Sequence, residues 1–404
     1  MPRSDSLAVR VLLTALVAFG PLSTDLYLPS LPTLVRVFES DIATVQLTLS
    51  VFLVGFAVSM LVYGPLADRF GRRPVLIGGV AIFLAASAAC TLATTIEQLI
   101  AARFVQALGA CCGPVVARAI VRDVFGRDRA ATVLAYMTMA MALAPAVGPV
   151  LGGALIEVFG WRSNFVVLTL IAVAVLAAVL MLLAETNVHR DPEALRPARL
   201  LRNYLTLLGN RTYVGCVLTS AFSYSGIFAF ISGSSFVLVN GLGLSPGEYG
   251  ASFGAVVLGY MGGSYVAGRI SGRLGTERMM RAGTLVSAAA GLTGFALAAA
   301  GIISVPAIIV PTALFLFGTG MTLPNSMAAA VGPYPTMAGL ASALLGFVQM
   351  GVGAAVGILV GHLHDGTPVP MAAAIAVMAL LAAATAFTFI RHRAAGGTGA
   401  APGA

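Results

Sequence analysis

Long apolar runs separated by short polar links dominate this sequence of 404 residues. About 20 consecutive apolar residues are enough for a helix to cross the roughly 30 Å hydrocarbon core of a bilayer. Hydrophobic residues make up 59% of the chain and charged residues only 9%, whereas a soluble domain carries about 25% charged residues. We therefore predict an all-α membrane protein with twelve transmembrane helices, the first of which is an uncleaved span. The predicted spans cover residues 8–28, 45–64, 75–95, 98–119, 130–154, 163–184, 212–236, 248–268, 281–301, 305–327, 338–361 and 371–391.

A single longer link divides the twelve spans into two sets of six. It has the sequence ETNVHRDPEALRPARLLRNYLTLLGNR, whereas the other links are short. The segments GPLADRFGRRPVLIGG and GSYVAGRISGRLGTERMMRAG lie at equivalent places six spans apart, and both are basic with recurring glycine. Two parallel six-helix repeats suit a transporter with a cleft between its halves. We predict an N-terminal six-helix bundle (1–184), a cytoplasmic linker (185–211) and a C-terminal six-helix bundle with a short cytoplasmic tail (212–404).

The arginines predict the orientation of the chain in the membrane. All 23 basic residues are arginines. If both termini are cytoplasmic, all of them except Arg36, Arg103 and Arg162 fall on cytoplasmic links or at span ends facing them. Basic residues concentrate on the cytoplasmic side of membrane proteins, so we predict this orientation. The absence of lysine excludes a Walker A phosphate loop and Schiff-base catalysis, both of which need a lysine amine.

The link between the second and third spans, GPLADRFGRRP, is the most specific local motif. A basic membrane anchor accounts for Arg72 and Arg73, but not for Asp68 or for two glycines that allow a tight turn and close helix approach. The link resembles the signature G-x-x-x-D-R-x-G-R-R of the major facilitator superfamily. The resemblance implies a cytoplasmic latch between the halves, in which Asp68 pairs with basic groups and caps a neighbouring helix. The residues assigned to this latch are Gly64, Asp68, Arg69, Gly71, Arg72 and Arg73, with Arg122 and Asp123 as partners.

The fourth span contains two polar residues on one face of a helix. Arg103 and Gln106 are three residues apart, which places them on the same side. In one interpretation Arg103 snorkels to the outer surface, but the greater depth of Gln106 argues against it. The run RFVQALG resembles the R-x-x-Q-G motif of proton-coupled facilitators, with Ala107 in place of the motif's glycine.

The fifth span carries a stripe of small residues in the segment APAVGPVLGG. Small residues four apart permit close contact between membrane helices, and prolines within a helix remove backbone donors and can bend it. The pattern G-P-x-x-G-G at this place resembles the motif that marks antiporters in the superfamily, which favours export over uptake. The residues of this antiporter motif are Pro145, Gly148, Pro149, Gly152 and Gly153.

The first span ends in STDLYLPSLP, which resembles the first-span motif of twelve-span drug:proton antiporters. Together with QALGACCGPVVARAIVRD and MAGLASALLGFVQM, it makes the chain most similar to the bicyclomycin-resistance (Bcr/CflA) type. This resemblance covers nearly the whole chain. It implies the major facilitator fold, alternating access and proton-driven efflux of small drugs.

Asp25 is the only acidic residue well inside an apolar run. An ionised Asp at the centre of a membrane helix costs about 2.5–3.5 kcal/mol on insertion scales, and such residues usually line ion or proton pathways. The alternative is that Asp25 sits at the outer interface and merely meets water. We predict that Asp25 is the proton-coupling acid and that Arg103 pairs with it.

Aromatic, methionine and polar side chains on five spans are candidates for the substrate pocket. Aromatic and methionine walls suit an adaptable site for apolar drugs, although each residue taken alone is more often facing lipid or packing between helices. The candidates are Gln106, Tyr136, Met137, Met141, Phe222, Tyr224, Phe228, Asn325 and Gln349.

These features favour one function and leave rivals open. We predict a monomeric exporter in the bacterial inner membrane that exchanges small amphipathic drugs for protons, with no cofactor, metal or nucleic-acid partner. The four cysteines are expected to be small core residues. The main rival is an exporter of a small metabolite such as an amino acid or sugar, which needs more fixed polar groups in its pocket. A channel does not explain the antiporter motif. A membrane-embedded enzyme needs a nucleophile–base pair or metal ligands, and no HExxH or comparable cluster is present.

Overall fold

A computed structural model of the protein describes residues 6–187, 190–334 and 337–389. Between 126 and 146 the side chains described are those of Val133, Met137 and Pro145. Within these residues the secondary structure is helical and there is no strand. The elements are α1 (Leu7–Asp25), η1 (Leu28–Ser30), α2 (Leu31–Val37), α3 (Ile42–Phe70), α4 (Arg72–Leu92), α5 (Ile96–Ala110), α6 (Cys112–Phe159), α7 (Arg162–Leu182), α8 (Pro197–Leu208), α9 (Arg211–Ser235), η2 (Phe236–Gly241), α10 (Pro246–Leu274), α11 (Thr276–Ala299), α12 (Val305–Val331), α13 (Ala338–His362) and α14 (Val369–Thr388).

The helices accommodate the predicted membrane spans. Within the described residues, ten stretches are long and apolar enough to cross a membrane. The other two predicted spans correspond to α10 and to the second part of α6, which includes the apolar helix Val147–Phe159. Glycine, serine and tyrosine are frequent in α10, which makes this helix less apolar without interrupting it. The chain is therefore an all-α, multi-pass membrane protein.

Helix α6 contains the end of one membrane pass and the whole of the next. Its Gly113 packs against the backbone of Leu16, and the Arg10 guanidinium lies 5.4 Å from the centre of the Phe125 ring. Further along, Gly152 packs against Leu26, beyond the end of α1. Near Phe125 the chain therefore reaches the end of the molecule that is predicted to be cytoplasmic, which we call the arginine-rich end. It then returns beside α1. This reversal is the predicted link between the fourth and fifth spans.

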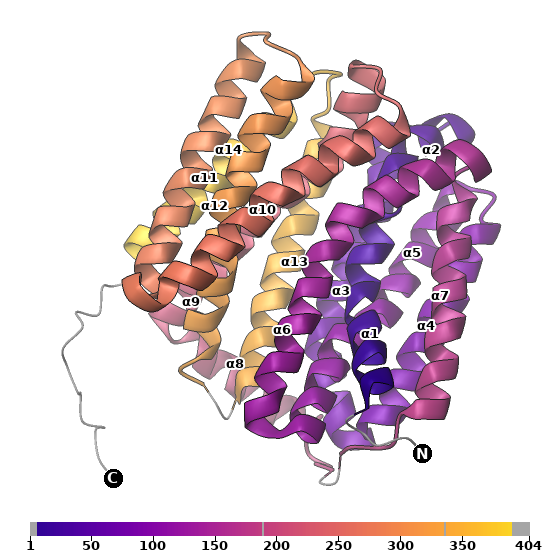
Figure 1. The fold of residues 1–404 in the computed structure, drawn as a ribbon, viewed down its shortest axis with the longest axis vertical. Coiled ribbons are helices and arrows are strands. Elements are labelled where there is room, and N and C mark those ends of the chain that lie inside the picture. The colour runs from indigo at the N-terminus through magenta and orange to yellow at the C-terminus, as the bar shows by residue number, and fades with distance from the viewer. Residues whose placement is uncertain (1–5, 188–189, 335–336, 390–404) are drawn as a thin grey trace.

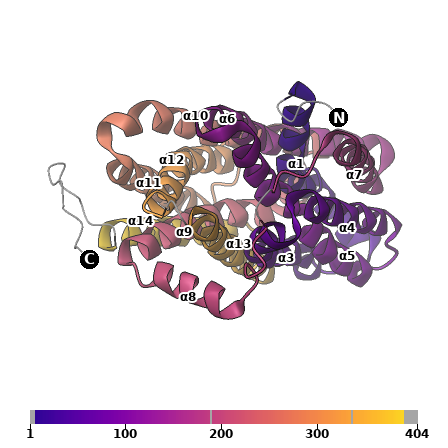
Figure 2. The same ribbon diagram turned by 90° about the horizontal axis from the view of Figure 1, so that it is seen from below.

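The helices before and after α8 form two groups, which lie side by side in Figures 1 and 2. In the first group, α1 packs against α6, and α4 packs against α5 and α7. In the second group, α12 packs against α10 and α11, and α9 packs against α13 and α14. The groups meet where α3 contacts α13 and where α6 contacts α10.

Hydrogen bonds join the two groups at the end opposite the arginines. Nε2 of Gln46 in α3 donates to the Ser232 carbonyl in α9 at 2.6 Å. The Gly247 N–H in α10 donates to the Glu157 carboxylate in α6 at 3.0 Å. Figure 1 shows α6 and α10 converging toward this end. The conformation is thus one in which the two groups are held together at the end that the sequence predicts to face outward.

Candidate functional site

Asp25 is buried where the two groups of helices meet. It is the last residue of α1, and only 3% of its surface is exposed. The helix ends there because Pro29 has no N–H to donate to the Asp25 carbonyl, and the chain continues through η1 into α2. The Asp25 carboxyl lies near the phenol groups of Tyr224 in α9 and Tyr249 in α10. The interpretation that Asp25 meets water at the outer interface is therefore wrong for this conformation.

Two glycines of α6 allow this helix to approach Asp25 closely. A Cβ atom added at Gly148 would lie 2.9 Å from the Cβ of Asp25, and one added at Gly152 would meet the Leu26 carbonyl oxygen. Real Cβ atoms essentially never come nearer than 3.0 Å to such atoms. The small residues of the antiporter motif thus fit α6 against the end of α1.

The same segment of α6 also reaches the second group of helices. Gly153 lies against the backbone of Pro246, and the Pro149 carbonyl lies against Gly250 of α10. Pro149 is buried, whereas Pro145, one turn earlier, is half-buried. The antiporter motif therefore contacts both the residue predicted to carry the proton and the helix across the interface.

Arg103 in α5 is fully buried within the first group. Its Nη1 donates to the Ser23 carbonyl at 3.0 Å and to Oε1 of Gln106 at 2.6 Å. Its Nε donates to the Thr48 carbonyl of α3 at 3.4 Å. Carbonyl groups near the end of a helix carry partial negative charge, so the end of α1 stabilises the guanidinium.

Three aromatic rings also surround the Arg103 guanidinium. The ring centres of Phe52, Tyr27 and Phe165 lie 4.3 Å, 4.8 Å and 5.9 Å from its central carbon. A cation over the face of an aromatic ring is attracted by the quadrupole of the ring. In this conformation Arg103 therefore does not snorkel to the outer surface.

The predicted ion pair between Asp25 and Arg103 is not formed in this structure. Among the described residues, neither side chain takes part in an ion pair. Arg103 approaches α1 at the Ser23 carbonyl, whereas the Asp25 side chain faces α6 and the second group. The two residues are linked through the end of α1 and not by direct contact.

Gln106 belongs to a hydrogen-bond network inside the first group, which differs from its predicted place in the substrate pocket. It is fully buried. Its Oε1 accepts from Arg103, and its Nε2 donates to the Ser87 hydroxyl at 2.8 Å. The Ser87 hydroxyl in turn donates to the Phe83 carbonyl at 2.7 Å. The amide therefore orients Arg103 and has no free face for a substrate.

Two pocket candidates lie together near Asp25. The rings of Tyr224 and Phe228, one turn apart on α9, are 5.1 Å apart between centres. Phe228 is buried close to Gly353 of α13, and Tyr224 is half-buried. This aromatic pair gives the junction around Asp25 an apolar wall.

Within the part of the chain that the structure describes, no contact brings the remaining pocket candidates to Asp25. Asn325 is buried, and its Nδ2 donates to the Met321 carbonyl of its own helix at 2.8 Å. Met137 is buried, whereas Phe222 and Gln349 are half-buried. The side chains of Tyr136 and Met141 lie outside the described residues.

At the arginine-rich end, Arg72 joins two carboxylates. Its Nη1 lies 2.5 Å from Oδ1 of Asp68, and its Nε lies 3.1 Å from Oδ2 of Asp123. The Thr186 hydroxyl donates to the same oxygen of Asp123 at 3.3 Å. The α3–α4 link, the inner part of α6 and the start of the linker therefore meet in one cluster.

Glu185 provides the helix cap that the sequence analysis assigned to Asp68. Its carboxylate accepts hydrogen bonds from the N–H groups of Arg72 at 2.9 Å and Arg73 at 3.2 Å, in the first turn of α4. It also accepts from the next two linker residues at 2.9 Å and 2.8 Å. Gly71 has φ 105° and lies against this carboxylate, where a side chain would have no room. Partial desolvation opposes ionisation of Glu185, but the four donors outweigh it and hold the pKa of this carboxyl below its usual value.

The linker is docked on the first group directly after Glu185. Nδ2 of Asn187 donates to the Ala67 carbonyl at 3.2 Å and to the Asp68 carbonyl at 3.0 Å. The N–H of Asp191 also donates to the Asp68 carbonyl at 3.1 Å. Neither Glu185 nor Asn187 was predicted from the sequence as a functional residue. The position of Glu185, an acid directly after the sixth predicted span, could have indicated its role.

Comparison with known proteins identifies the family. The Major Facilitator Superfamily matches residues 13–357 of the chain. The chain belongs to this superfamily. Multidrug resistance protein MdtL of Shigella dysenteriae serotype 1 is 35% identical, over 83% of this chain and 84% of that protein. The bicyclomycin resistance protein homolog of Haemophilus influenzae is 29% identical, over 87% of this chain and 88% of that protein. The crystal structure of a D-xylose-proton symporter matches with a TM-score of 0.76 at 14% identity, covering 96% of this chain and 98% of that one, which shows the shared fold.

In this member of the superfamily, three residues assigned to the latch do not take part in the ion pairs of the Arg72 cluster among the described residues. A Cβ atom added at Gly64 would meet nothing within 4 Å, so the close helix approach predicted there is absent in this conformation. The Arg69 guanidinium lies 5.3 Å from the centre of the Phe70 ring. Nε of Arg122 donates to the Arg118 carbonyl of its own helix at 3.4 Å.

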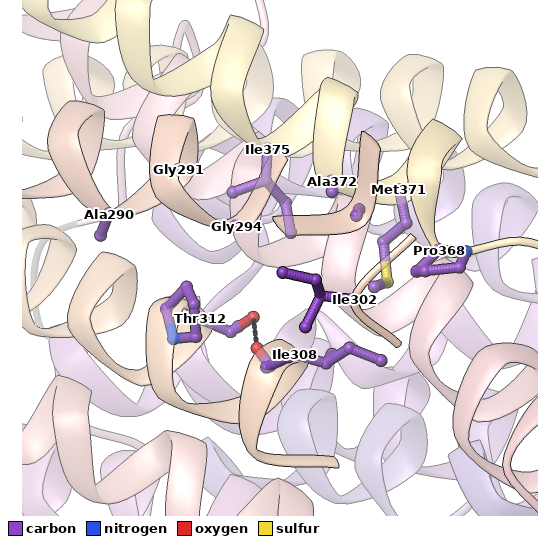
Figure 3. A pocket seen from close by; sticks show the side chains of 13 residues that line it. Ala290, Gly291, Gly294, Ile302, Ile308, Thr312, Pro368, Met371, Ala372 and Ile375 are labelled. Atoms are coloured by element: carbon purple, nitrogen blue, oxygen red, sulfur yellow. Dashed lines mark hydrogen bonds between the residues drawn. The ribbon is translucent and has the colours of Figure 1, made fainter. Parts of the chain in front are cut away.

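One small apolar pocket lies between α11, α12 and α14, away from the pocket candidates of the first group (Figure 3). Its lining includes Gly291, Ile308 and Met371, and its Thr312 hydroxyl is satisfied by the Ile308 carbonyl at 2.7 Å. The space open to a water-sized sphere is about 20 Å³, whereas a single water needs roughly 10–15 Å³. This pocket is therefore too small for a drug.

We expect Glu185→Gln to loosen the linker from α4 without unfolding the protein. A neutral amide loses the attraction between a carboxylate and a helix N-terminus, and losing a cap typically costs about 0.5–2 kcal/mol. The cost should lie at the low end of this range because Glu185 is exposed to solvent. Amide hydrogen exchange should accelerate at 72–73 and 186–187. The matched control is Glu193→Gln, which removes a surface ion pair with Arg196 and should leave exchange at these amides unchanged. If the exchange rates at these amides are equal in the two variants, Glu185 does not cap α4.

Acid should have the same effect as this substitution. Because the pKa of Glu185 is lowered in the folded protein, its cap is fully present above the unfolded-state pKa of about 4.3 and is lost as the pH falls through the lower folded-state value. Exchange at these amides, corrected for the intrinsic rate, should therefore stay constant around neutral pH and rise only in strongly acidic solution.

Proposed function

We propose that this superfamily member is a proton-driven exporter of small amphipathic drugs, and a transporter rather than an enzyme. The observation that carries the proposal is Asp25: a carboxyl buried between the two groups of helices and against the antiporter motif at Gly148, with no cationic partner among the described residues. The names of the relatives, which are multidrug and bicyclomycin resistance proteins, support the choice of substrate class. The alternative is an exporter of a small metabolite.

Proton movement is coupled to drug export if the proton and the drug compete for the same state of the site. An unpaired charge buried among apolar side chains is costly, so we infer that Asp25 carries its proton while the outer end is closed. A drug that enters from the cytoplasm beside Tyr224 displaces this proton. After the two groups rock and the outer end opens, the drug leaves and Asp25 reloads from outside.

The membrane potential is large enough to drive this cycle. One charge moving down about 100 mV releases about 2.3 kcal/mol, and tenfold accumulation costs about 1.4 kcal/mol. One proton therefore sustains roughly a fiftyfold drug gradient before any pH difference is added. Coupling needs no second acid on this account.

Arg103 acts as a positioning residue in this proposal. Its guanidinium is held by three carbonyl or amide oxygens and by three rings, and it fixes the end of α1 at Ser23. Asp25 lies two residues beyond this anchor. Movement at Asp25 therefore transmits to α5 through the hydrogen bond from the Arg103 side chain to the Ser23 carbonyl.

The same proposal places the protein in the bacterial inner membrane, with both termini and the 185–211 linker in the cytoplasm, as a monomer. The arginine distribution supports this orientation. Both termini lie outside the described residues. The arginine-rich end then faces the cytoplasm, and the hydrogen bonds of Gln46 and Glu157 close the outer side.

A drug-susceptibility panel tests the function directly. Cells that express the protein should tolerate several amphipathic drugs better than cells with the empty vector, and a protonophore should remove the difference. If expression changes the tolerance of the cells to none of the drugs, while vesicles that contain the protein export an amino acid or a sugar, the protein is a metabolite exporter.

We expect Asp68→Asn to slow transport while leaving the protein in the membrane. Asp68 contributes an ion pair with Arg72 whose carboxylate is 50% exposed, and such pairs contribute only about 0–1 kcal/mol to stability. The amount of purified protein and its melting temperature should therefore match the wild type, whereas vesicle transport should fall. Normal transport would show that the latch role implied by the family does not apply here.

A further inference from the structure

Helix α8 in the linker has two apolar sides, of which only one is covered by the protein. Leu207 is fully buried, and with Tyr204 it packs in a cluster that includes Tyr213 of α9 and Ala341 of α13. Three other leucines remain largely exposed: Leu201 at 60%, Leu205 at 58% and Leu208 at 47%.

The sides of α8 follow a definite order around the helix. At about 100° per residue, the exposed leucines are centred about 100° from the packed side formed by Tyr204 and Leu207. Arg199, Arg202 and Thr206, all exposed, occupy the side beyond the leucines. Around the helix, the side packed against the protein is therefore followed by the exposed leucines and then by the basic and polar residues. A helix lying in a membrane interface beside a bundle has this order of surfaces.

The position of α8 matches the depth of such an interface. It leads through Gly209 and Asn210 directly into α9, and its partners Tyr213 and Ala341 lie in the first turns of their helices, at the arginine-rich end. Figure 2 looks along the bundle and shows α8 lengthwise at its edge, whereas neighbouring helices are seen nearly end on. The helix therefore runs across the direction of the membrane passes, at their predicted cytoplasmic end.

One basic residue beside the leucines is available for a headgroup. Arg199 is paired with Asp191 at 2.7 Å. Arg202 is exposed and has no partner among the described residues. A guanidinium binds phosphate oxygens in a bidentate manner, and the cytoplasmic leaflet is negatively charged.

We propose that α8 is an interfacial anchor, which inserts Leu201, Leu205 and Leu208 into the cytoplasmic leaflet and binds an anionic phospholipid headgroup through Arg202. Since Glu185, Asn187 and Asp191 are docked on the first group and α8 on the second, the anchor holds the linker at the membrane surface between them. This inference depends on the membrane embedding of the chain and is independent of the transported substrate.

Labelling two adjacent positions of the full chain tests the insertion. The four native cysteines are buried, so a fluorescent maleimide should react selectively with Leu205→Cys or, as the matched control, Thr206→Cys. Both residues are exposed, so neither substitution disturbs packing. In phosphatidylcholine vesicles containing phosphatidylglycerol, a nitroxide on the upper acyl chain should quench the label at 205 several-fold more than the label at 206. Aqueous iodide should show the reverse order.

Two other results would overturn the anchor. Equal iodide quenching at both positions would mean that the leucines face water. Shielding of the label at 205 from both iodide and the lipid nitroxide would mean that another protein surface covers them.

Lipid composition tests the headgroup contact. Adding phosphatidylglycerol to phosphatidylcholine vesicles should increase the shielding of the 205 label from iodide. Arg202→Gln should abolish this increase, whereas Arg199→Gln, at an arginine already paired with Asp191, should retain most of it. If shielding is the same in both lipids, or if Arg202→Gln responds like the wild type, Arg202 does not bind an anionic headgroup.

Discussion

Asp25→Asn is expected to abolish drug efflux driven by the proton gradient. The amide has the shape of the carboxyl but cannot take up or release a proton, and Asp25 is the acid that the structure buries at the junction of the two groups. In vesicles, a drug gradient of roughly fiftyfold, the value that one proton supports at about 100 mV, should collapse to none. Exchange of labelled for unlabelled drug should persist, because it needs alternating access but no proton.

Asp41→Asn is the matched control for this experiment. Asp41 is exposed, and its carboxylate caps α3 by accepting from the Thr44 N–H at 2.9 Å. Asparagine is an equally good cap, so this variant should transport normally. If Asp25→Asn still moves drug uphill, Asp25 is a structural residue, and the coupling acid has to be sought at Glu97, Glu157 or Asp68.

Gly153→Ala is expected to open the outer end of the protein. An added Cβ atom would lie 2.5 Å from the Pro246 carbonyl oxygen across the contact between α6 and α10, and this atom belongs to the backbone, which cannot swing away. Overpacking of this kind costs typically about 1–3 kcal/mol, which shifts a two-state equilibrium roughly five- to hundredfold. Because the clash lies between the groups, it should disfavour the outer-closed state and leave each group folded.

Distances between spin labels measure this shift. Arg36 and Leu363 are exposed residues at the outer end of the first and second groups, and labelled cysteines there should move apart in Gly153→Ala. Gly78→Ala is the control, because a Cβ atom at Gly78 meets nothing within 4 Å. An unchanged distance in Gly153→Ala, or an equal change in both variants, would contradict a role for the antiporter motif in outer closure.

The fold was largely predictable because it follows from the lengths of apolar runs. Helical passes, the two sets of spans and the polar link between them follow from bilayer thickness and hydropathy. The ends of helices were less predictable. The first span was expected to end near residue 28, yet Pro29 breaks α1 at Asp25 and the pass continues to Val37 through a second helix. Local proline effects move such boundaries without changing the apolar pattern.

The partners of the charged residues could not be predicted from spacing along single spans. Arg103 and Asp25 were expected to pair because they are opposite charges in neighbouring helices. In the structure Arg103 donates through Nη1 to the end of α1 and lies against aromatic rings, although its Nη2 has no hydrogen-bond partner among the described residues. The Asp25 side chain faces the second group instead. Which partners these residues meet depends on how the helices are rotated about their axes, and a single sequence does not specify these rotations.

The cap on α4 was missed for a related reason. This role was predicted for Asp68, which is near in the chain, but Glu185, more than a hundred residues later, occupies the site. The start of the linker reaches α4 only because α7 packs beside it. A contact that depends on which helices are neighbours is visible only in the assembled bundle.

Proton release on drug binding tests the central claim most directly. Purified protein in a weakly buffered detergent solution with a pH indicator should release protons when a transported drug is added, because drug and proton compete at Asp25. Asp25→Asn should bind the same drug without acidifying the solution, and Asp41→Asn should behave like the wild type. Proton release that persists in Asp25→Asn would contradict the account.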